Sequence, residues 1–598
     1  MSDTADKQIA DLIVERLNSW SVERIYGYAG DGNNPLLGAL RRARQAPRFI
    51  QAKHEESAAF MAVGEAKYGG HVGVVCSTQG PGAAHLLNGL YDAKLDSAPV
   101  VALVGQQVTS VLGSGYQQEI DLQNLFADVA SPYMQFVASP EQLPMVLDRA
   151  FRSALAHSKP AVVIIPHDVQ QQPAPDLGQT HGEIVTAPRW SRGELLPRSE
   201  DVADAAEVIR TGEKIAILAG RGVKNAQQEL IELAERLGAG ITTSLLGKPY
   251  VDESHPLAAG TMGHLGTTAS AHVLQECDTL LIIGSNDPWT EFYPPPGQAH
   301  AVQIDNNPAM LANRYPVDVG LVGDSAPSIK ALLDRLPVRG QTPWRIEVER
   351  QVRNGREIAR GRADVPASPL NPELVVRRFA ARIPDNAQLA VDVGSSVYHY
   401  VRQMSLPTTV EAHLSSTLAS MGCAVPYGIS AKELAPGRPV AAVAGDGAMQ
   451  MLGINELITL AARWPEWKDP RFVLLVIHNQ DLAEVSWEQR EFEAQPRFSA
   501  SQDIPRFDFA EYAELLGLRG LRISEPGSIT GVLDEAFAAE RPVLIEAVTD
   551  REVPLLPPYP HGKNVLEPMR TGLDAEGEDG KHALNLLNEY ARIEEEHQ

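Results

Sequence analysis

Short apolar runs alternate with longer amphipathic segments along most of this 598-residue chain. The runs are rich in Val, Ile, Leu and Ala, and turn-forming residues bound many of them. This alternation is typical of α/β chains, in which buried parallel strands are covered by helices on both faces. The expected strands include residues 72–76, 100–104, 161–165, 215–218, 280–283, 301–304, 440–444 and 472–477.

Two stretches interrupt the alternation and divide the chain. Residues 170–197 are polar and contain several prolines, as a linker does, and the charged segment 343–362 forms a second connection that we expect to be helical in part. We therefore predict an α/β fold of three doubly wound parallel-sheet domains. Their predicted limits are residues 1–180, 190–340 and 365–553, followed by a Pro-rich and then acidic tail at 554–598.

The first and third domains contain a faint internal repeat. Residues 147–151 precede an apolar run at 161–165, and the similar residues 533–537 precede another at 543–545. Each pair is interpreted as a helix that leads into a final buried strand. A shared topology is the simple explanation, and chance similarity is the alternative.

The tail has one clear helix candidate, at residues 582–595. It carries an apolar stripe of Leu584, Leu586, Leu587 and Tyr590 beside an acidic polar face. An acidic face does not favour a membrane surface, so we expect this helix to pack on the body of the protein.

Composition narrows the class of protein. The apolar share of 44% fits a globular chain, and the net charge of −24 argues against nucleic acid and anionic lipid as partners. The three cysteines are far apart and form neither a metal pattern nor a disulfide framework. No signal peptide or membrane span is expected. The expectation is a cytoplasmic enzyme or assembly.

Candidate metal and phosphate chemistry follows two expected strands. Gly445, Asp446 and Gly447 come after the run 440–444, and Asn479 comes after the run 472–477. One carboxylate and one amide carbonyl at neighbouring strand ends are oxygen ligands suited to Mg²⁺, while the glycines and a following helix N-terminus suit a diphosphate. Asp446 and Asn479 are 33 positions apart (479 − 446). A simple turn with an unrelated Asn is the alternative, because such short motifs are weak alone.

Glu55 is the candidate acid–base residue. It stands between an expected strand end and an Ala-rich helix, where it would be partly buried. Burial disfavours the charged form of a carboxyl and lets it hold or share a proton. The alternative is an exposed first-turn Glu favoured by the helix dipole, which is the interpretation preferred for Glu56.

Ordered motifs along the chain resemble the acetolactate synthase and pyruvate oxidase family of thiamine diphosphate (ThDP) enzymes. The resemblance runs from about residue 26 to 553, closest to pyruvate oxidase-like members. Besides the Gly-Asp-Gly segment, it rests on these motifs: His54-Glu55-x-x-Ala58-Ala59, Ser77-Thr78-Gln79-Gly80-Pro81-Gly82, Asn88-Gly89-Leu90-Tyr91-Asp92-Ala93, Pro99-Val100-Val101-Ala102 and Gly115-Tyr116-Gln117-Gln118-Glu119.

The resemblance implies a pyrimidine-binding, a central and a diphosphate-binding domain, with an active site between two chains. Glu55 of one subunit would serve the cofactor pyrimidine, and Mg²⁺ would be held by Asp446, Asn479 and the carbonyl of Asp481 of another. A homodimer would be the minimal unit and a homotetramer the expected assembly. The remaining ThDP-binding positions implied by the family are Gly30, Gly394, Ser395, Ser396, Ala419, Met421, Gly445, Gly447 and Ala448.

The central domain resembles the FAD-binding domain of pyruvate oxidases. Strand-end glycines and a strand-end Asp suit a dinucleotide pyrophosphate and a hydroxyl partner. Acetolactate synthases also bind FAD here without net redox use, and decarboxylases keep the fold without flavin. The implied FAD positions are Gly220, Gly222, Val223, Thr261, Met262, Gly284, Asn286, Asp305 and Asn306.

The expected reaction pocket differs from the family at two positions. Gln117 replaces a usual Phe beside Gln118, and Glu484 replaces a usual apolar residue, with Arg490 as its candidate partner. The resulting hypothesis is oxidative decarboxylation of a 2-oxo acid, expected to be pyruvate, with electrons passed to FAD and then to quinone or oxygen. The alternatives are a non-redox acetolactate synthase-like carboligase or 2-oxo acid decarboxylase, and a non-catalytic ThDP-fold binding protein.

Overall fold

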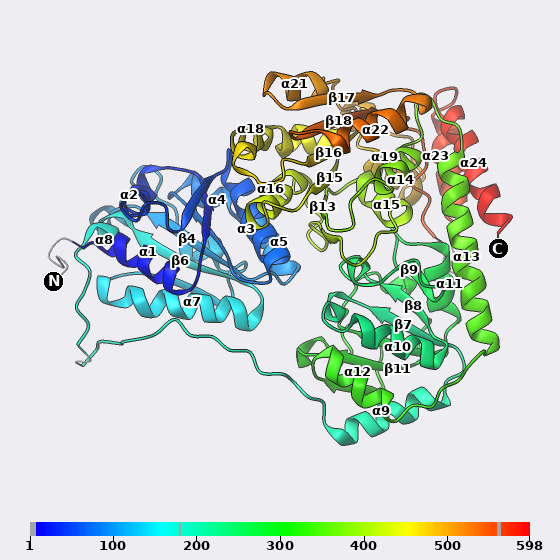
Figure 1. Ribbon diagram of the computed structural model, residues 1–598, viewed down its shortest axis with the longest axis horizontal. Coiled ribbons are helices and arrows are strands. Elements are labelled where there is room, and N and C mark those ends of the chain that lie inside the picture. The colour runs from blue at the N-terminus through cyan, green and yellow to red at the C-terminus, as the bar shows by residue number, and fades with distance from the viewer. Residues whose placement is uncertain (1–6, 179–180, 559–563, 598) are drawn as a thin grey trace.

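Three parallel sheets organise the chain (Figure 1). The computed structural model describes residues 7–178, 181–558 and 564–597. Each sheet has six strands with helices on its faces, which confirms the predicted α/β class. The apolar runs became strands because both faces of these sheets are covered: every residue of the strands at 100–106, 160–166 and 472–478 is buried.

The N-terminal sheet has the strand order β2-β1-β3-β4-β6-β5. Its strands pair in parallel throughout. They are β1 (Arg24–Gly27), β2 (Arg48–Gln51), β3 (Gly73–Ser77), β4 (Val100–Gln106), β5 (Tyr133–Phe136) and β6 (Pro160–Pro166).

The C-terminal sheet repeats this topology. Its order is β14-β13-β15-β16-β18-β17, which is the N-terminal order when the strands are counted from β13. The strands are β13 (Gln388–Val391), β14 (Glu411–His413), β15 (Val440–Gly445), β16 (Phe472–His478), β17 (Arg519–Ile523) and β18 (Val543–Val548). Helices α7 (Leu143–His157) and α22 (Ile529–Ala538) lead into the corresponding strands β6 and β18, so the internal repeat is confirmed.

The central sheet has a different order, β12-β11-β10-β7-β8-β9. Counted from β7 and read from the other edge, this is 3-2-1-4-5-6, the order of doubly wound dinucleotide-binding sheets. The strands are β7 (Ile215–Ala219), β8 (Gly240–Thr243), β9 (Ala258–Thr261), β10 (Thr279–Ile283), β11 (His300–Asp305) and β12 (Val319–Val322).

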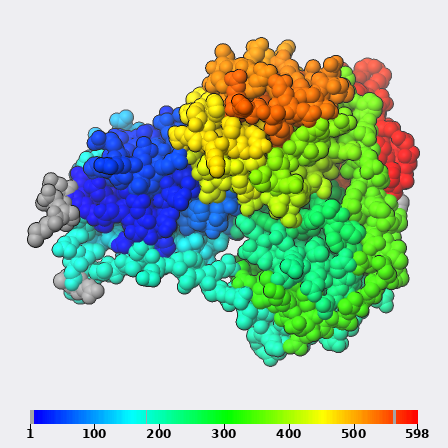
Figure 2. Space-filling view, viewed as in Figure 1, coloured from blue at the N-terminus to red at the C-terminus, as the bar shows by residue number. Residues whose placement is uncertain are grey.

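The N- and C-terminal units share one hydrophobic core. Helix α3 (Glu55–Gly69) packs on α16 (Ala424–Leu434), and the rings of Phe60 and Tyr427 meet edge to face at 6.3 Å. Buried Lys67 lies 2.7 Å from an oxygen of Asp96 and donates to the Tyr427 hydroxyl at 2.7 Å. The space-filling view shows the N-terminal unit (blue) directly against the yellow part of the C-terminal unit (Figure 2).

Two connections behave as the sequence predicted. The polar linker has neither helix nor strand over its described residues 172–178 and 181–198, and it leads to α9 (Ser199–Thr211) of the central unit (Figure 1). The second connection is one long helix, α13 (Pro343–Asp364), and the tail forms α23 (Leu566–Ala575) and α24 (Lys581–Glu595). Leu586, Leu587 and Tyr590 are buried in a core shared with Ile358 of α13, so the predicted packing of the tail helix on the body is confirmed.

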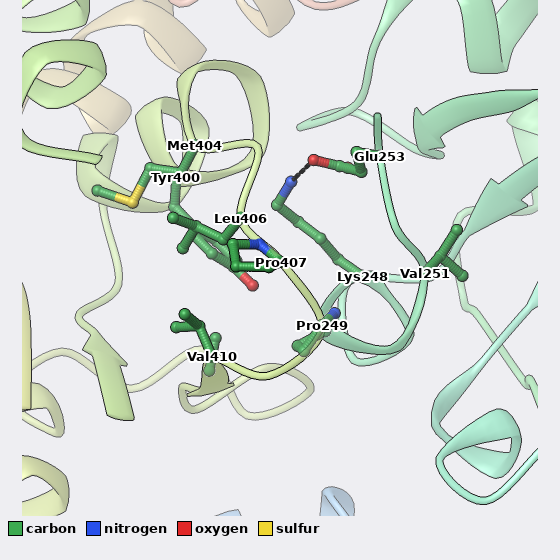
Figure 3. Close-up of a pocket in the computed structure, with 10 residues that line it drawn as sticks. Lys248, Pro249, Val251, Glu253, Tyr400, Met404, Leu406, Pro407 and Val410 are labelled. Atoms are coloured by element: carbon green, nitrogen blue, oxygen red, sulfur yellow. Dashed lines mark hydrogen bonds and ion pairs between the residues drawn. The ribbon is translucent and has the colours of Figure 1, made fainter. Parts of the chain in front are cut away.

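The central and C-terminal units also touch around a very small cavity. Lys248 and Glu253 form an ion pair on one side, and Tyr400 and Leu406 line the other (Figure 3). The cavity measures about 10 Å³, room for about one water molecule. None of the helices in the described part of the chain combines the length and the apolar composition needed to cross a membrane.

Candidate active site

Three strand-end turns of the N-terminal sheet meet at one edge. The backbone N–H of Gly32, in the turn after β1, donates to the Thr78 hydroxyl at 3.0 Å. The Gln79 amide, after β3, donates to Asp31 and to the Gln118 side chain, both at 2.9 Å. Gly30 packs so closely on Thr78 that a Cβ there would lie 2.5 Å from the Thr78 Cβ. The predicted residues Gly30 and Gln118 therefore belong to one joined set of turns.

Glu55 lies beside these turns, at the first position of α3. His54 caps the helix by accepting the Glu56 backbone N–H at 3.2 Å. The Glu55 side chain is largely buried, and its Oε2 lies 2.9 Å from Nδ1 of His85, which ends α4 (Pro81–His85). The Glu55 carboxyl therefore lies where the sequence predicted, partly buried at the start of a helix. Its imidazole partner could not be seen in the sequence motifs.

The Asp446 carboxylate is fixed by three backbone donors. Gly447 donates to its Oδ1 at 2.8 Å, and Asn479 and Gln480 donate to its Oδ2 at 3.1 and 2.6 Å. Strands β15 and β16 are neighbours, so their carboxyl ends bring these turns together. Burial raises the pKa of the Asp446 carboxyl to about 6, and a bound cation would favour the charged form.

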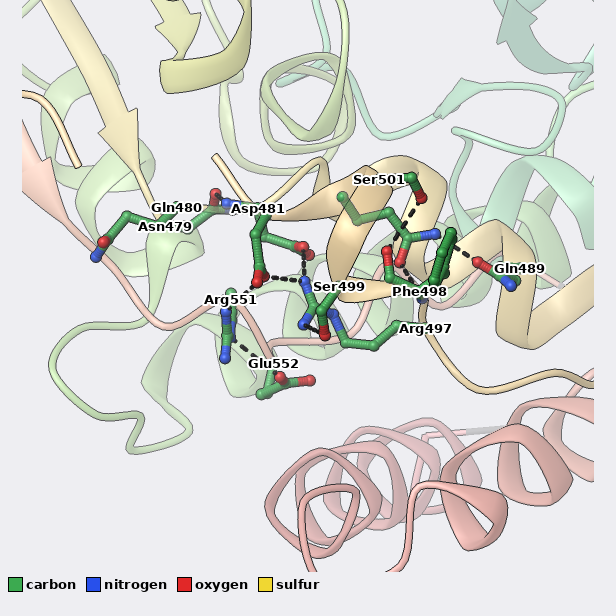
Figure 4. Close-up of polar contacts among 12 residues, drawn as sticks. Asn479, Gln480, Asp481, Gln489, Arg497, Phe498, Ser499, Ser501, Arg551 and Glu552 are labelled. Carbon is green, nitrogen blue, oxygen red and sulfur yellow. Dashed lines mark hydrogen bonds and ion pairs between the residues drawn. The ribbon is translucent and has the colours of Figure 1, made fainter. Parts of the chain in front are cut away.

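The Asn479–Asp481 turn has a second anchor. The backbone N–H of Asp481 donates to Oδ1 of Asn479 at 3.0 Å. The Asp481 carboxylate points the other way, into an ion pair with Arg497, which also contacts Asp503 at 2.8 Å (Figure 4). The Asp481 side chain is thus occupied by Arg497, and the metal-binding role of its backbone carbonyl stays a prediction.

The predicted diphosphate contacts lie at two helix starts. After Asp446 the chain continues as helix α17 (Asp446–Ala448), a π-helical turn (Met449–Gly453) and α18 (Ile454–Arg463), and Gly447 and Ala448 are in its first turn. Gly394 precedes α15 (Ser395–Gln403) with φ of +110°, where a side chain would be strained. Backbone N–H groups at such starts suit an anion.

Asp392, at the end of β13, links this turn to the Met421 segment. Its Oδ1 accepts the N–H groups of Val393 at 2.9 Å and Gly422 at 2.7 Å, and its Oδ2 accepts that of Ala424 at 3.0 Å. Ala419 has φ of +57°, and Met421 is half-buried. Sequence reasoning missed Asp392, although an Asp directly after an apolar strand was a usable signal.

The predicted pocket residues separate into two groups. Gln117 and Gln118 are exposed, and the Gln117 carbonyl accepts the Gln107 side chain at 2.8 Å. Glu484 lies at the start of α19 (Ala483–Phe492), where burial and the neighbouring Glu488 raise its pKa to about 7. The suggested pairing of Glu484 with Arg490 is wrong. Arg490 contacts Glu552 at 3.0 Å and Glu576 at 2.8 Å, because six residues along a helix lead to another face.

The predicted FAD residues follow β7, β9, β10 and β11 at the carboxyl edge of the central sheet. A Cβ on Gly220 would lie 2.1 Å from the Gly284 carbonyl, so these loops need glycine for their own packing. Asp305 accepts the Asn307 N–H through Oδ1 at 2.8 Å, and burial raises its pKa. The other predicted FAD residues have partners within the central unit. Val223 and Met262 lie in its core, and Gly222 packs on Gly284. The side chains of Thr261, Asn286 and Asn306 contact Thr243, Met310 and Asp324, respectively.

Two sheets of equal topology, with the Glu55 carboxyl at the edge of one and the Asp446–Asn479 turn at the edge of the other, are the arrangement expected of a ThDP-binding protein. The central sheet lies between them in the sequence. Three family models match in this order. The thiamine pyrophosphate enzyme N-terminal TPP binding domain matches residues 7–125, the central domain residues 202–332 and the C-terminal TPP binding domain residues 392–547. The chain belongs to the thiamine pyrophosphate enzyme family.

Similar proteins cover almost the whole chain. YdaP of Bacillus subtilis, which carries the name of a thiamine pyrophosphate-containing protein, is 33% identical over 557 residues, 92% of this chain and 93% of the relative. Pyruvate oxidase of Lactiplantibacillus plantarum is 30% identical over 551 residues, 91% and 89% of the two chains. A probable acetolactate synthase large subunit of Methanocaldococcus jannaschii is 30% identical over 584 residues, 94% and 95% of the two chains.

Proposed function

We propose that the protein is a ThDP- and Mg²⁺-dependent enzyme that oxidatively decarboxylates a 2-oxo acid, pyruvate in the first instance. In this proposal the two electrons pass to FAD and then to quinone or oxygen. The observation that supports bound FAD is the 3-2-1-4-5-6 order of the central sheet, with Gly220, Gly284 and Asp305 at its carboxyl edge. The likeness to a pyruvate oxidase over most of both chains supports it.

The residues present fit Mg²⁺ and a diphosphate. Asp446 is 2% exposed and held in one orientation by three N–H groups. Buried Nε2 of His478 has no hydrogen-bond partner among the described residues and lies 3.9 Å from Oδ2 of Asp446. A cation held by Asp446, the Asn479 side chain and the Asp481 carbonyl would satisfy the hard-oxygen preference of Mg²⁺. Open space beside Gly394 and Gly445 leaves room for phosphate oxygens.

Bound ThDP supplies an electron sink for carbanion chemistry next to a 2-oxo acid carbonyl. The chain supplies the remaining functions. Glu55 holds and returns a proton at its carboxyl, and the helix starts at Gly394 and Gly447 orient the diphosphate through backbone N–H groups. Met421, half-buried beside the Asp392-linked turn, supplies an apolar contact to the cofactor.

A non-redox carboligase is the second candidate. The acetolactate synthase relative is as similar in identity as the pyruvate oxidase relative, and it covers slightly more of this chain. One measurement separates the two: the absorbance spectrum of purified protein before and after anaerobic pyruvate. Bleaching of a yellow protein supports the oxidase. A yellow protein that stays oxidised while acetolactate or acetoin forms contradicts it.

A non-catalytic ThDP-fold protein is disfavoured because Glu55, Asp446 and Asn479 are all present and placed at strand or helix ends. The variant Glu55→Gln tests this. Loss of acid–base function at a catalytic carboxyl costs about 10²–10⁴-fold in rate, so unchanged turnover would contradict the catalytic role.

We further propose that the active unit is at least a homodimer, expected as a homotetramer, with Glu55 of one chain serving the Asp446 site of another. Co-expressed Glu55→Gln and Asp446→Ala chains test the arrangement. A mixed dimer then holds one intact site, and random pairing restores about a quarter of wild-type activity. A site formed within one chain gives no recovery.

A further inference from the structure

The Glu55 carboxyl divides its two oxygens between different surroundings. Oε2 lies 2.9 Å from Nδ1 of His85, the hydrogen-bond partner that the described residues give this carboxyl. Oε1 lies above Gly82, where a Cβ would come within 3.0 Å of it. Glycine therefore keeps the space beside Oε1 clear, and Oε1 is the oxygen left to serve a cofactor nitrogen.

His85 connects this buried carboxyl to the protein surface. The Glu55 side chain is 11% exposed, whereas the His85 side chain is 43% exposed. The His85 ring also packs against the ring of His54, with centroids 4.4 Å apart and the ring planes tilted by 30°, so its orientation is restricted on two sides. An imidazole can hold a hydrogen bond through one nitrogen while the other exchanges a proton with water.

We propose that His85 is a positioning residue and proton-exchange partner for Glu55. It fixes Oε2 so that Oε1 faces the cofactor, and it passes protons between the carboxyl and solvent. In the exchange step a proton moves from Oε2 to Nδ1 as another leaves Nε2 for water, and no electrons are transferred. This inference rests on the proposed function, because it assigns Glu55 its acid–base role.

The chain contains a matched control for this contact. At the opposite end of the α3 segment, Nε2 of His71 lies 2.9 Å from Oε1 of Glu65. It is also a His–Glu pair that involves α3, and it lies at the far end of that helix from Glu55. A variant of His71 therefore shows the effect of losing a His–Glu contact on α3 in general, and a variant of His85 shows the effect of losing the contact to Glu55.

The test measures how fast the thiazolium C2 hydrogen of bound ThDP exchanges with deuterium, by acid quench and NMR. It needs no 2-oxo acid and reports directly on cofactor activation. His85→Leu removes orientation and proton exchange, whereas His85→Gln keeps an N–H donor but cannot relay a proton. We expect exchange to slow about 100-fold in the first and about tenfold in the second, with His71→Gln within about twofold of wild type.

Further measurements make the result decisive. ThDP affinity is expected to change less than about threefold in the two His85 variants, and added imidazole is expected to restore part of the exchange rate of His85→Ala. Wild-type exchange in His85→Leu, or an equal loss in His71→Gln, overturns the role of His85. A wild-type protein that binds no ThDP contradicts the proposed function instead, so the two failures are distinguishable.

Discussion

The carboxylate of Asp392 accepts the backbone N–H of Gly422 at 2.7 Å. Through this contact the turn that begins α15 and the turn that carries Met421 form one unit. Asp392 follows β13, an interior strand of the C-terminal sheet, and is 1% exposed. Two of the proposed ThDP-binding segments, at Gly394 and Met421, therefore depend on one buried side chain that touches neither expected phosphate nor metal ligand.

The substitution Asp392→Asn tests this dependence. An amide has a single acceptor oxygen and would turn its NH₂ toward backbone donors, which leaves buried N–H groups without partners at a cost of about 1–3 kcal/mol. We expect weaker ThDP binding, by roughly ten- to a hundredfold, with the fold retained. Titration of ThDP at a fixed Mg²⁺ concentration measures this loss of affinity. Asp385→Asn, at an exposed position in the loop before β13, is the control, and an equal loss there would contradict a local effect.

Arg497 is expected to set metal affinity. Its guanidinium pairs with the carboxylates of Asp481 and Asp503, and its backbone N–H donates to Glu576 in the tail at 2.9 Å. The variant Arg497→Gln frees the Asp481 side chain and loosens the turn that we propose to bind the metal. Loss of groups that orient ligands typically costs 10–100-fold in metal affinity, and we expect that loss for Mg²⁺ in the presence of ThDP.

The neighbouring Arg551 provides the comparison. It contacts Asp503 at 3.3 Å and Glu552 at 3.4 Å, without a hydrogen bond to Asp481 (Figure 4). Calorimetric titration of Mg²⁺ into each ThDP-saturated variant is the measurement. Arg551→Gln is expected to bind Mg²⁺ like the wild type. Equal weakening in both variants would show that general charge, rather than the hold on Asp481, sets the affinity.

Glu484 gives the fold a pH dependence of predictable sign. Burial and the like charge of Glu488 raise its pKa from 4.5 to about 7. The folded state then binds this proton more tightly than the unfolded state, so the free energy of unfolding falls as pH rises from about 4.5 to 7 and stays lower above that.

Glu484→Gln removes this penalty. The variant should be more stable than wild type at pH 8, by about 1–3 kcal/mol, while the two differ little at pH 4.5. Thermal unfolding midpoints at both pH values check it. Glu493→Gln, an exposed position just beyond the end of the same helix, should change neither midpoint appreciably. A gain of equal size at both pH values would contradict the assignment to Glu484.

The sequence alone was enough to predict which residues lie together where neighbouring buried strands end. Asp446 and Asn479 were predicted to meet because both follow buried strands, and neighbouring β15 and β16 bring them together. The sequence did not reveal contacts that need the third dimension. Arg497 reaches Asp481 across a loop, and Asp392 reaches Gly422 across 30 positions. The expected Glu484–Arg490 pair does not form because Arg490 lies on another face of the helix, where it contacts Glu552 and Glu576.

The tail helix is expected to stabilise the region around α15 and α19 as well as itself. Leu587 of α24 is fully buried in a core that includes Tyr398 of α15 and Trp487 of α19, whereas Leu584 is only partly buried against it. Leu587→Ala should therefore lower the free energy of unfolding by about 2–5 kcal/mol, and Leu584→Ala by clearly less.

Because a chain of several domains need not unfold in one step, the comparison is made on thermal midpoints with and without ThDP and Mg²⁺. If the core carries the tail's effect to α15, Leu587→Ala also lowers ThDP affinity and Leu584→Ala does not. Equal effects of the two variants would show that the tail stabilises only itself.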